Sequence, residues 1–181
     1  TTGSRNVAIG IAALGALDTN NNNTAVGFQA QSGRTGGNDN TAVGAYCMNA
    51  TATAGQNTGL GKSCLHDLTS GHDNTAVGLN AGFHITTGAR NTAVGQSALE
   101  DNTTASDNVA IGQEAMMKNQ TGGSNVAIGR YALRTLGTDT GSGTVFGQLN
   151  VAIGQSASYN QNNDSMNVAV GANALQNCTT G

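Results

Sequence analysis

Apolar and polar positions recur along this chain with a period of 17 residues. Each unit begins with Asn, followed by Thr or Val, then Ala (Gly59 in one unit), then Val, Ile or Leu, and then Gly. One interval, from Asn125 to Asn150, has 25 residues in place of 17. A short, fixed period is typical of stacked-repeat proteins. The units start at Asn6, Asn23, Asn40, Asn57, Asn74, Asn91, Asn108, Asn125, Asn150 and Asn167.

With each unit numbered from its Asn, positions 2–5 predict a short strand, because β-branched and small residues alternate there. Positions 7–9 predict a second short strand, with the Gly at position 5 forming the corner between the two. Thr, Gly and Asn near the end of the unit are typical of turns. Helical repeats need about 33 or 34 residues, twice this period. We therefore expect an all-β fold, a parallel β-solenoid of ten 17-residue coils that forms a single domain over residues 1–181.

Each phase of the repeat predicts a place in the coil. The branched residue at position 4 is expected to point into the interior, and the small residue at position 8 to lie where the two walls approach. The ten Asn residues at position 1 are expected to form a ladder of amide hydrogen bonds along the rod. Each coil buries only about three apolar side chains, too few to offset the ordering of its backbone, so lateral association of chains is expected.

Composition narrows the function classes. Charged residues make up 9% of the chain, against roughly 25% in ordinary soluble domains. The net charge of −3 gives no reason to expect nucleic-acid binding, and no apolar run approaches the ~20 residues of a membrane span. No nucleophile–base pair or carboxylate pair is specified, so we expect neither an enzyme nor a cofactor. Residues 1–3 and 179–181 are both Thr-Thr-Gly, which suggests a segment of a longer repetitive polypeptide.

The motif Asn-Thr-Ala-Val-Gly-x-x-Ala-Leu at residues 91–99, echoed at 74–78, resembles the repeats of bacteriophage tail fibres. It also resembles the head repeats of trimeric autotransporter adhesins. The resemblance implies a left-handed β-roll assembled as an intertwined homotrimer in an extracellular fibre, on a virion tail or a bacterial surface. The expected function is the shaft or head of a phage tail fibre that supports attachment to a host receptor. The alternative is a bacterial adhesin head that binds host matrix or glycans.

An ice-binding solenoid is a remote alternative. Thr occupies position 2 in five consecutive units, which would form a regular column along the rod. Val interrupts the column in the other five units, and no Thr-x-Thr array accompanies it. The five Thr residues are Thr24, Thr41, Thr58, Thr75 and Thr92.

The longer interval contains eight extra residues, within about 137–149. An insertion in a solenoid must leave the rod as a loop on one face, either as a tolerated excursion or as a binding loop. Exposed aromatic residues beside polar groups suit the recognition of a cell-surface glycan or a protein receptor. The candidate receptor-binding residues in and near the insertion are Tyr131, Arg134, Thr138, Asp139 and Phe146.

Two smaller groups of residues lie at neighbouring phases. Cys47 and Cys64 both occupy position 8, one coil apart, within the reach of a disulfide. Their side chains would point in parallel in a column that is otherwise Ala, which favours buried thiols. His66, Asp67 and His84 could approach each other on the turn side. The three His residues show no metal-motif spacing, so no metal site is expected.

Overall fold

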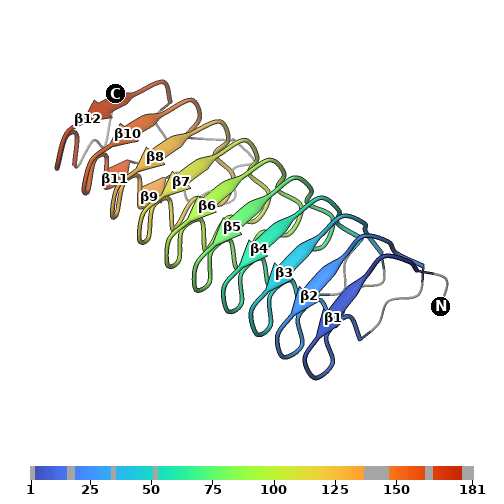
Figure 1. Cartoon of the computed structure of the whole chain (residues 1–181). Coiled ribbons are helices and arrows are strands. Elements are labelled where there is room, and N and C mark those ends of the chain that lie inside the picture. The colour runs from blue at the N-terminus through green and yellow to red at the C-terminus, as the bar shows by residue number, and fades with distance from the viewer. Residues whose placement is uncertain are drawn as a thin grey trace.

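A computed structural model describes residues 3–15, 19–33, 36–50, 53–136, 147–161 and 165–176. The chain forms an elongated stack of coils with its two termini at opposite ends (Figure 1). Ten three-residue strands make one parallel sheet, in chain order, and two further strands pair separately. No helix is present in the described part, and hence none that could cross a membrane. The predicted all-β parallel solenoid is therefore confirmed.

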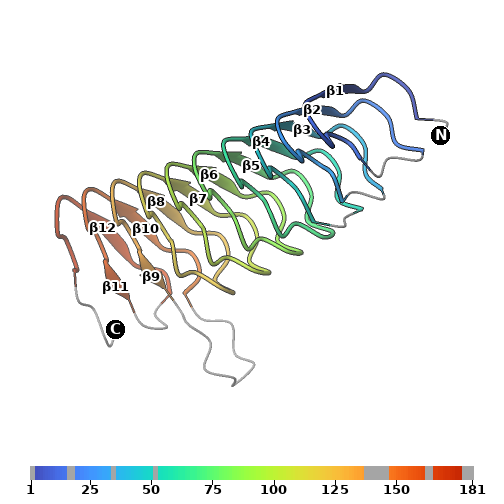
Figure 2. The same ribbon diagram turned by 90° about the horizontal axis from the view of Figure 1, so that it is seen from below.

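The ten-stranded sheet runs along one side of the stack, and the connecting turns run along the other (Figure 2). The remaining strands, β9 and β11, pair in parallel on the turn side. The strands of the large sheet are β1 (Val7–Ile9), β2 (Thr24–Val26), β3 (Thr41–Val43), β4 (Thr58–Leu60), β5 (Thr75–Val77), β6 (Thr92–Val94), β7 (Val109–Ile111), β8 (Val126–Ile128), β10 (Val151–Ile153) and β12 (Val168–Val170). The small pair is β9 (Thr135–Leu136) and β11 (Asn160–Gln161).

The strand register matches the sequence period. Thr75 pairs with Thr92, 17 residues further on, and the same register continues across the longer interval, where Val126 pairs with Val151. Residues 147–149 belong to the regular coil, because the Gly147 carbonyl accepts the same Asn side-chain bond that position 15 accepts in other coils. Residues 137–146, the rest of the stretch expected to contain the eight extra residues, lie outside the described residues. Of the receptor candidates, Thr138, Asp139 and Phe146 lie outside the described residues.

The side of the interior formed by the sheet is lined by smaller side chains than the sequence predicted. The Ala side chains at positions 3 and 8, such as Ala76 and Ala81, are fully buried. Leu or Met at position 9 and Leu or Ile at position 12 complete the core, as Leu99 and Ile85 show. The prediction that position 4 points inward is wrong, since Ile111 is 39% exposed. Successive residues of a strand face opposite sides, so the burial of Ala at position 3 directs positions 2 and 4 outward.

The second predicted strand, at positions 7–9, is also wrong. In the sixth coil Ser97 has a φ of 55° and Leu99 a φ of 52°, which is left-handed and not extended backbone. The coils remain hydrogen-bonded there, because Ser97 N–H donates to Leu79 O at 2.9 Å and Leu99 N–H donates to Ala115 O at 3.0 Å. This wall is thus a stack of identical turns, linked to both neighbouring coils.

The Gly at position 5 is required for two reasons. Gly95 has a φ of 133°, a conformation that L side chains rarely adopt. A Cβ at Gly95 would also lie 2.5 Å from the carbonyl oxygen of Gly112 in the next coil. A side chain at this corner is therefore strained by the backbone conformation, and it also clashes wherever another coil follows.

The Asn at position 1 connects its coil in two directions. The side-chain Nδ2 of Asn91 donates to Asn74 Oδ1 at 3.1 Å and to the Ala105 carbonyl of its own coil at 2.9 Å. The backbone N–H of Asn91 also donates to Asn74 Oδ1, at 3.0 Å. Each buried Asn thus links successive coils and joins the start of a coil to its last turn.

Candidate functional site

The first candidate surface is the outward side of the ten-stranded sheet. We call the outward residues at positions 2 and 4 of its strands the sheet face. Position 2 carries Thr or Val and position 4 carries Val, Ile or Leu in all ten strands, with no charged residue in either column. Among them Leu60 is 49% exposed and Ile128 is 38% exposed. The sheet face is therefore a long, flat, uncharged surface that is partly apolar, and large apolar patches mark interaction sites.

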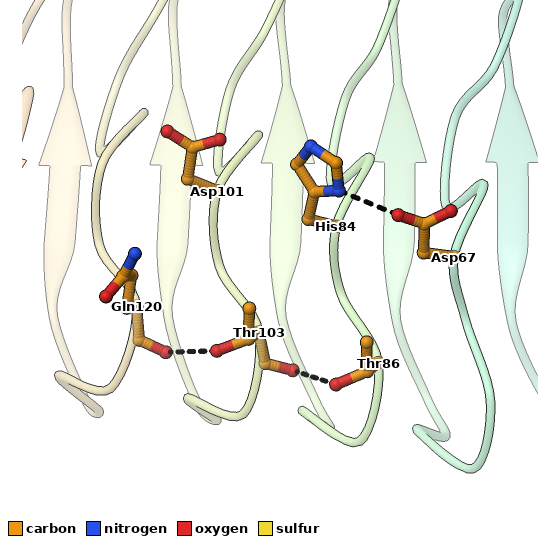
Figure 3. Close-up of a pocket in the computed structure, with 6 residues that line it drawn as sticks. All are labelled: Asp67, His84, Thr86, Asp101, Thr103 and Gln120. Atoms are coloured by element: carbon orange, nitrogen blue, oxygen red, sulfur yellow. Dashed lines mark hydrogen bonds and ion pairs between the residues drawn. The ribbon is translucent and has the colours of Figure 1, made fainter.

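The second candidate surface is a polar groove on the turn side of coils four to seven (Figure 3). Its volume is about 340 Å³, close to the lower end for small-molecule sites. Position 11 contributes one wall and position 13 contributes the other. We call this surface the polar groove, and it is lined by Asp67, His84, Thr86, Asp101, Thr103 and Gln120.

In the polar groove, the Asp67 carboxylate contacts two His side chains. Its two carboxylate oxygens contact His66 Nδ1 and His84 Nδ1, each at 2.7 Å. Partial burial by itself raises the pKa of Asp67, but the hydrogen bonds and charges of His66 and His84 outweigh it, so the pKa lies below its ordinary value. The His66 ring also stacks on Phe83, with centroids 4.7 Å apart. The expected approach of His66, Asp67 and His84 is confirmed.

The Thr hydroxyls of the polar groove have structural partners. Thr86 Oγ1 donates to Thr103 O at 3.0 Å, and Thr103 Oγ1 donates to Gln120 O at 3.3 Å. The side chains of Asp101 and of the exposed Gln120 form no hydrogen bond or ion pair with the described residues (Figure 3). Within the described ranges no three His, Cys, Asp or Glu residues are placed to hold a metal ion. The polar groove can therefore offer hydrogen bonds to a hydroxylated ligand such as a glycan.

The third candidate surface contains the two sequence candidates that the structure describes, Tyr131 and Arg134. We call it the Tyr–Arg cluster, formed by Glu114, Arg130, Tyr131, Arg134 and Tyr159. The Arg130 guanidinium lies 4.3 Å from the centre of the Tyr131 ring, and its Nη2 donates to Tyr131 Oη at 2.6 Å. The rings of Tyr131 and Tyr159 meet edge to face, 6.0 Å apart. The cluster thus joins three consecutive coils.

Arg134 is held within the Tyr–Arg cluster. Its Nε donates to Glu114 Oε2 at 2.7 Å, and its Nη1 donates to Tyr159 Oη at 3.3 Å. The hydrogen bond to Glu114 raises the pKa of Arg134 above its ordinary value. Glu114 and Tyr159 were not among the receptor-binding candidates. Glu114 shares position 7 of the repeat with Tyr131, and Tyr159 shares position 10 with Arg134. These shared positions were the signal that could have found them.

Comparison of the chain with models of protein families, with curated proteins and with solved structures gives no significant match. The functional argument therefore depends on the three surfaces themselves.

Proposed function

We propose that this chain is a structural segment of an extracellular fibre, the shaft or head of a phage tail fibre, that assembles as a homotrimer through its sheet face. The observation that carries the proposal is the outward direction of the Val, Ile and Leu side chains at position 4. No strand of the large sheet has an aliphatic residue larger than the one at position 4, and a single chain leaves residues such as Leu60 half exposed. Their burial would contribute stabilisation that the Ala-lined interior does not supply.

Further copies of the same chain are the occupants that best fit the sheet face. The sheet face presents the same pair of positions once per strand, so the side chains of two copies have the same spacing along the whole rod. Its Thr and Val side chains are short, which lets backbones approach closely, and the absence of charge removes the cost of desolvating ions. Three flat faces around a common axis bury one another and form a closed assembly. Parallel chains would also present three equivalent sets of turns at each height, and such multivalency raises avidity.

Sedimentation equilibrium tests this assembly directly. A mass three times the 18.0 kDa of one chain supports the homotrimer. A monomer at micromolar concentration contradicts self-association, and a stable dimer contradicts the three-fold arrangement.

The alternative is a bacterial adhesin head that itself binds host matrix or glycans. The polar groove and the Tyr–Arg cluster favour this alternative, because they combine exposed hydrogen-bonding groups with aromatic rings. A glycan array probed with the wild-type chain separates the two proposals. Wild-type binding that is lost in either Asp101→Asn or Tyr131→Ala points to the adhesin, and the variant that loses it identifies the surface used. If the wild-type chain binds no glycan on the array, the result supports a segment that only spaces a binding tip.

Ice binding remains the remote alternative. The observation in its favour is that Thr41, Thr58 and Thr75 all lie on the outward side of the sheet, in one register. Ice binding needs the sheet face exposed, whereas trimer formation buries it. Thermal hysteresis of the chain in solution would support ice binding, and its absence excludes that function.

A further inference from the structure

The one Gly at position 3 of the repeat lies against the only two Cys residues at position 8. Position 3 is Ala in the other nine units, and position 8 is Ala in the other eight. The exceptions are Gly59, Cys47 and Cys64, in two neighbouring coils. Because the two positions face each other across the narrow interior, these three departures from the repeat occur at one place in the rod.

The geometry explains why they occur together. A Cβ on Gly59 would lie 2.6 Å from Cys47 Sγ and 2.9 Å from Cys64 Sγ. Either separation is too short for a real methyl group, so the absence of a side chain at Gly59 provides the space that both sulfurs occupy. Both Cys side chains are fully buried. The site is thus shaped for two sulfur atoms, not for two independent small residues.

The two sulfurs themselves are 2.7 Å apart. They are not covalently joined in this structure, but non-bonded carbon atoms already prefer separations of about 3.5–4.0 Å, and sulfur is larger. The strands of these two coils pair directly, so the coils repeat at the strand spacing of about 4.7–4.9 Å, which lies within the range of about 4.4–6.8 Å between the Cα atoms of a disulfide. The distance therefore suits a covalent bond better than two stacked thiols.

We propose that Cys47 and Cys64 form a disulfide that links the third coil to the fourth. Its formation needs an oxidant, for which we name a small-molecule disulfide such as oxidised glutathione. The thiolate of one Cys attacks the oxidant, forms a mixed disulfide and releases one reduced thiol. The second Cys thiolate then attacks the sulfur of the first and releases the other reduced thiol. The two cysteines lose two electrons and two protons in total, and the oxidant becomes two thiols.

Burial determines when the bond can form and how it behaves afterwards. Because neither sulfur is exposed, the oxidant must act during folding or during a local opening of the two coils. Once the coils have closed, reductants are excluded in the same way. We therefore expect a disulfide that forms on refolding in the presence of oxidant and resists reduction in the native rod.

A thiol count on the full chain tests the proposal. The chain contains three Cys residues, and the third, Cys178, lies outside the described residues. After refolding with oxidised glutathione, denaturation and alkylation without reductant should label one thiol, and labelling after reduction should reach three. Peptide mapping should identify Cys47 joined to Cys64. Three labelled thiols in the unreduced sample, or a bond that uses Cys178, would overturn the proposal.

The proposal also predicts a stability difference. A disulfide that closes a loop of about 15 residues should raise the melting temperature by about 6–12 °C for a chain of this size. Cys47→Ala should melt at the same temperature with and without oxidant, whereas the wild type should melt higher after oxidation. Equal melting temperatures for oxidised and reduced wild type would contradict a cross-link between these coils.

Gly59→Ala supplies a matched control for the packing argument. In the wild type the added methyl group should lower the melting temperature and reduce the yield of the disulfide, because it enters the space of both sulfurs. In the Cys47→Ala/Cys64→Ala background it restores the Ala arrangement of the other coils, and the melting temperature should rise. A change of the same sign in both backgrounds contradicts a site shaped for the two sulfurs.

Discussion

The side-chain Nδ2 of Asn91 donates to Oδ1 of Asn74 at 3.1 Å, and Oδ1 of Asn91 accepts from Asn108 N–H at 3.1 Å. All of these groups are buried. The Asn amide thus supplies hydrogen bonds that neither the strands nor the turns of the solenoid could provide at this corner, and buried backbone groups need such partners.

Asn91→Ala should therefore destabilise the rod. The Asn108 N–H would lose its acceptor, and a buried donor without a partner costs about 1–3 kcal/mol. The measurement is thermal unfolding followed by circular dichroism. Gln96→Ala is the control, because Gln96 lies exposed in the same coil and its replacement should leave the midpoint nearly unchanged. Equal midpoints for Asn91→Ala and wild type would show that the ladder does not stabilise the fold.

Gly95→Ala should be more damaging, because it combines a left-handed φ with a clash against the backbone of the next coil. Strained backbone alone costs on the order of 1–3 kcal/mol, and the clash adds to it. Gly171 isolates the backbone strain from the clash, since it has a φ of 123° but nothing within 4 Å of a Cβ. Denaturant unfolding should rank the stabilities as wild type, then Gly171→Ala, then Gly95→Ala. The reverse order for the two variants would mean that contact between coils does not explain the Gly at position 5.

Ile111→Asp tests the sheet face. The side chain is already partly exposed in the single chain, so the variant should fold, but a carboxylate buried between copies lacks a partner. We expect the sedimenting mass to fall from three chains to one. Gln120→Asp places the same charge on the turn side of the same coil and should leave the assembly intact. A trimer that persists in Ile111→Asp would place the interface elsewhere.

The lowered pKa of Asp67 predicts that the stability of the fold decreases at low pH. Its pKa in the folded chain lies below the ordinary value of 3.8, so its stabilising contribution is fully present above that value and disappears as the pH falls through the folded pKa. With the Asp67 side chain 37% exposed, the contribution should stay below about 1 kcal/mol.

Melting temperatures at about pH 5 and about pH 3 measure this contribution, which is lost on acidification. Asp67→Asn should lose less stability between the two conditions than the wild type loses. Asp101→Asn is the control, because Asp101 lies in the same polar groove and forms no ion pair with any described residue. Identical losses in wild type and Asp67→Asn would contradict a role for the contacts with His66 and His84.

The period of the sequence was sufficient to predict the solenoid, but it did not show which residues face inward. Position 3 is Ala and position 4 is Val, Ile or Leu, and either column could be apolar core. The larger residue is more often buried in globular proteins, and for this reason position 4 was predicted to point inward. The structure selects Ala because position 3 faces position 8 across the coil so closely that only small side chains fit at these two positions. This distance is a property of the closed coil and cannot be obtained from one unit of sequence.

The candidate surfaces were predictable in part. The approach of His66, Asp67 and His84 followed from their phases, because residues 17 apart stack directly. The participation of Glu114 in the Tyr–Arg cluster depends on the directions of long side chains across three coils. Side-chain direction there is determined by left-handed turns such as that at Tyr131, where φ is 64°. A sequence pattern that predicts an extended strand at those positions cannot give the correct direction.

The pairing of β8 with β10 shows that a coil can gain residues without any change in the length of the rod. Ten residues, 137–146, stand between Leu136 and Gly147, yet Val126 and Val151 remain in the register of their neighbours. One more 17-residue unit would lengthen the rod by a single strand spacing of about 4.8 Å. An enlarged turn adds nothing to that length. Reach and surface decoration can therefore vary independently in such a rod, the first by duplication of whole units and the second by growth of individual turns.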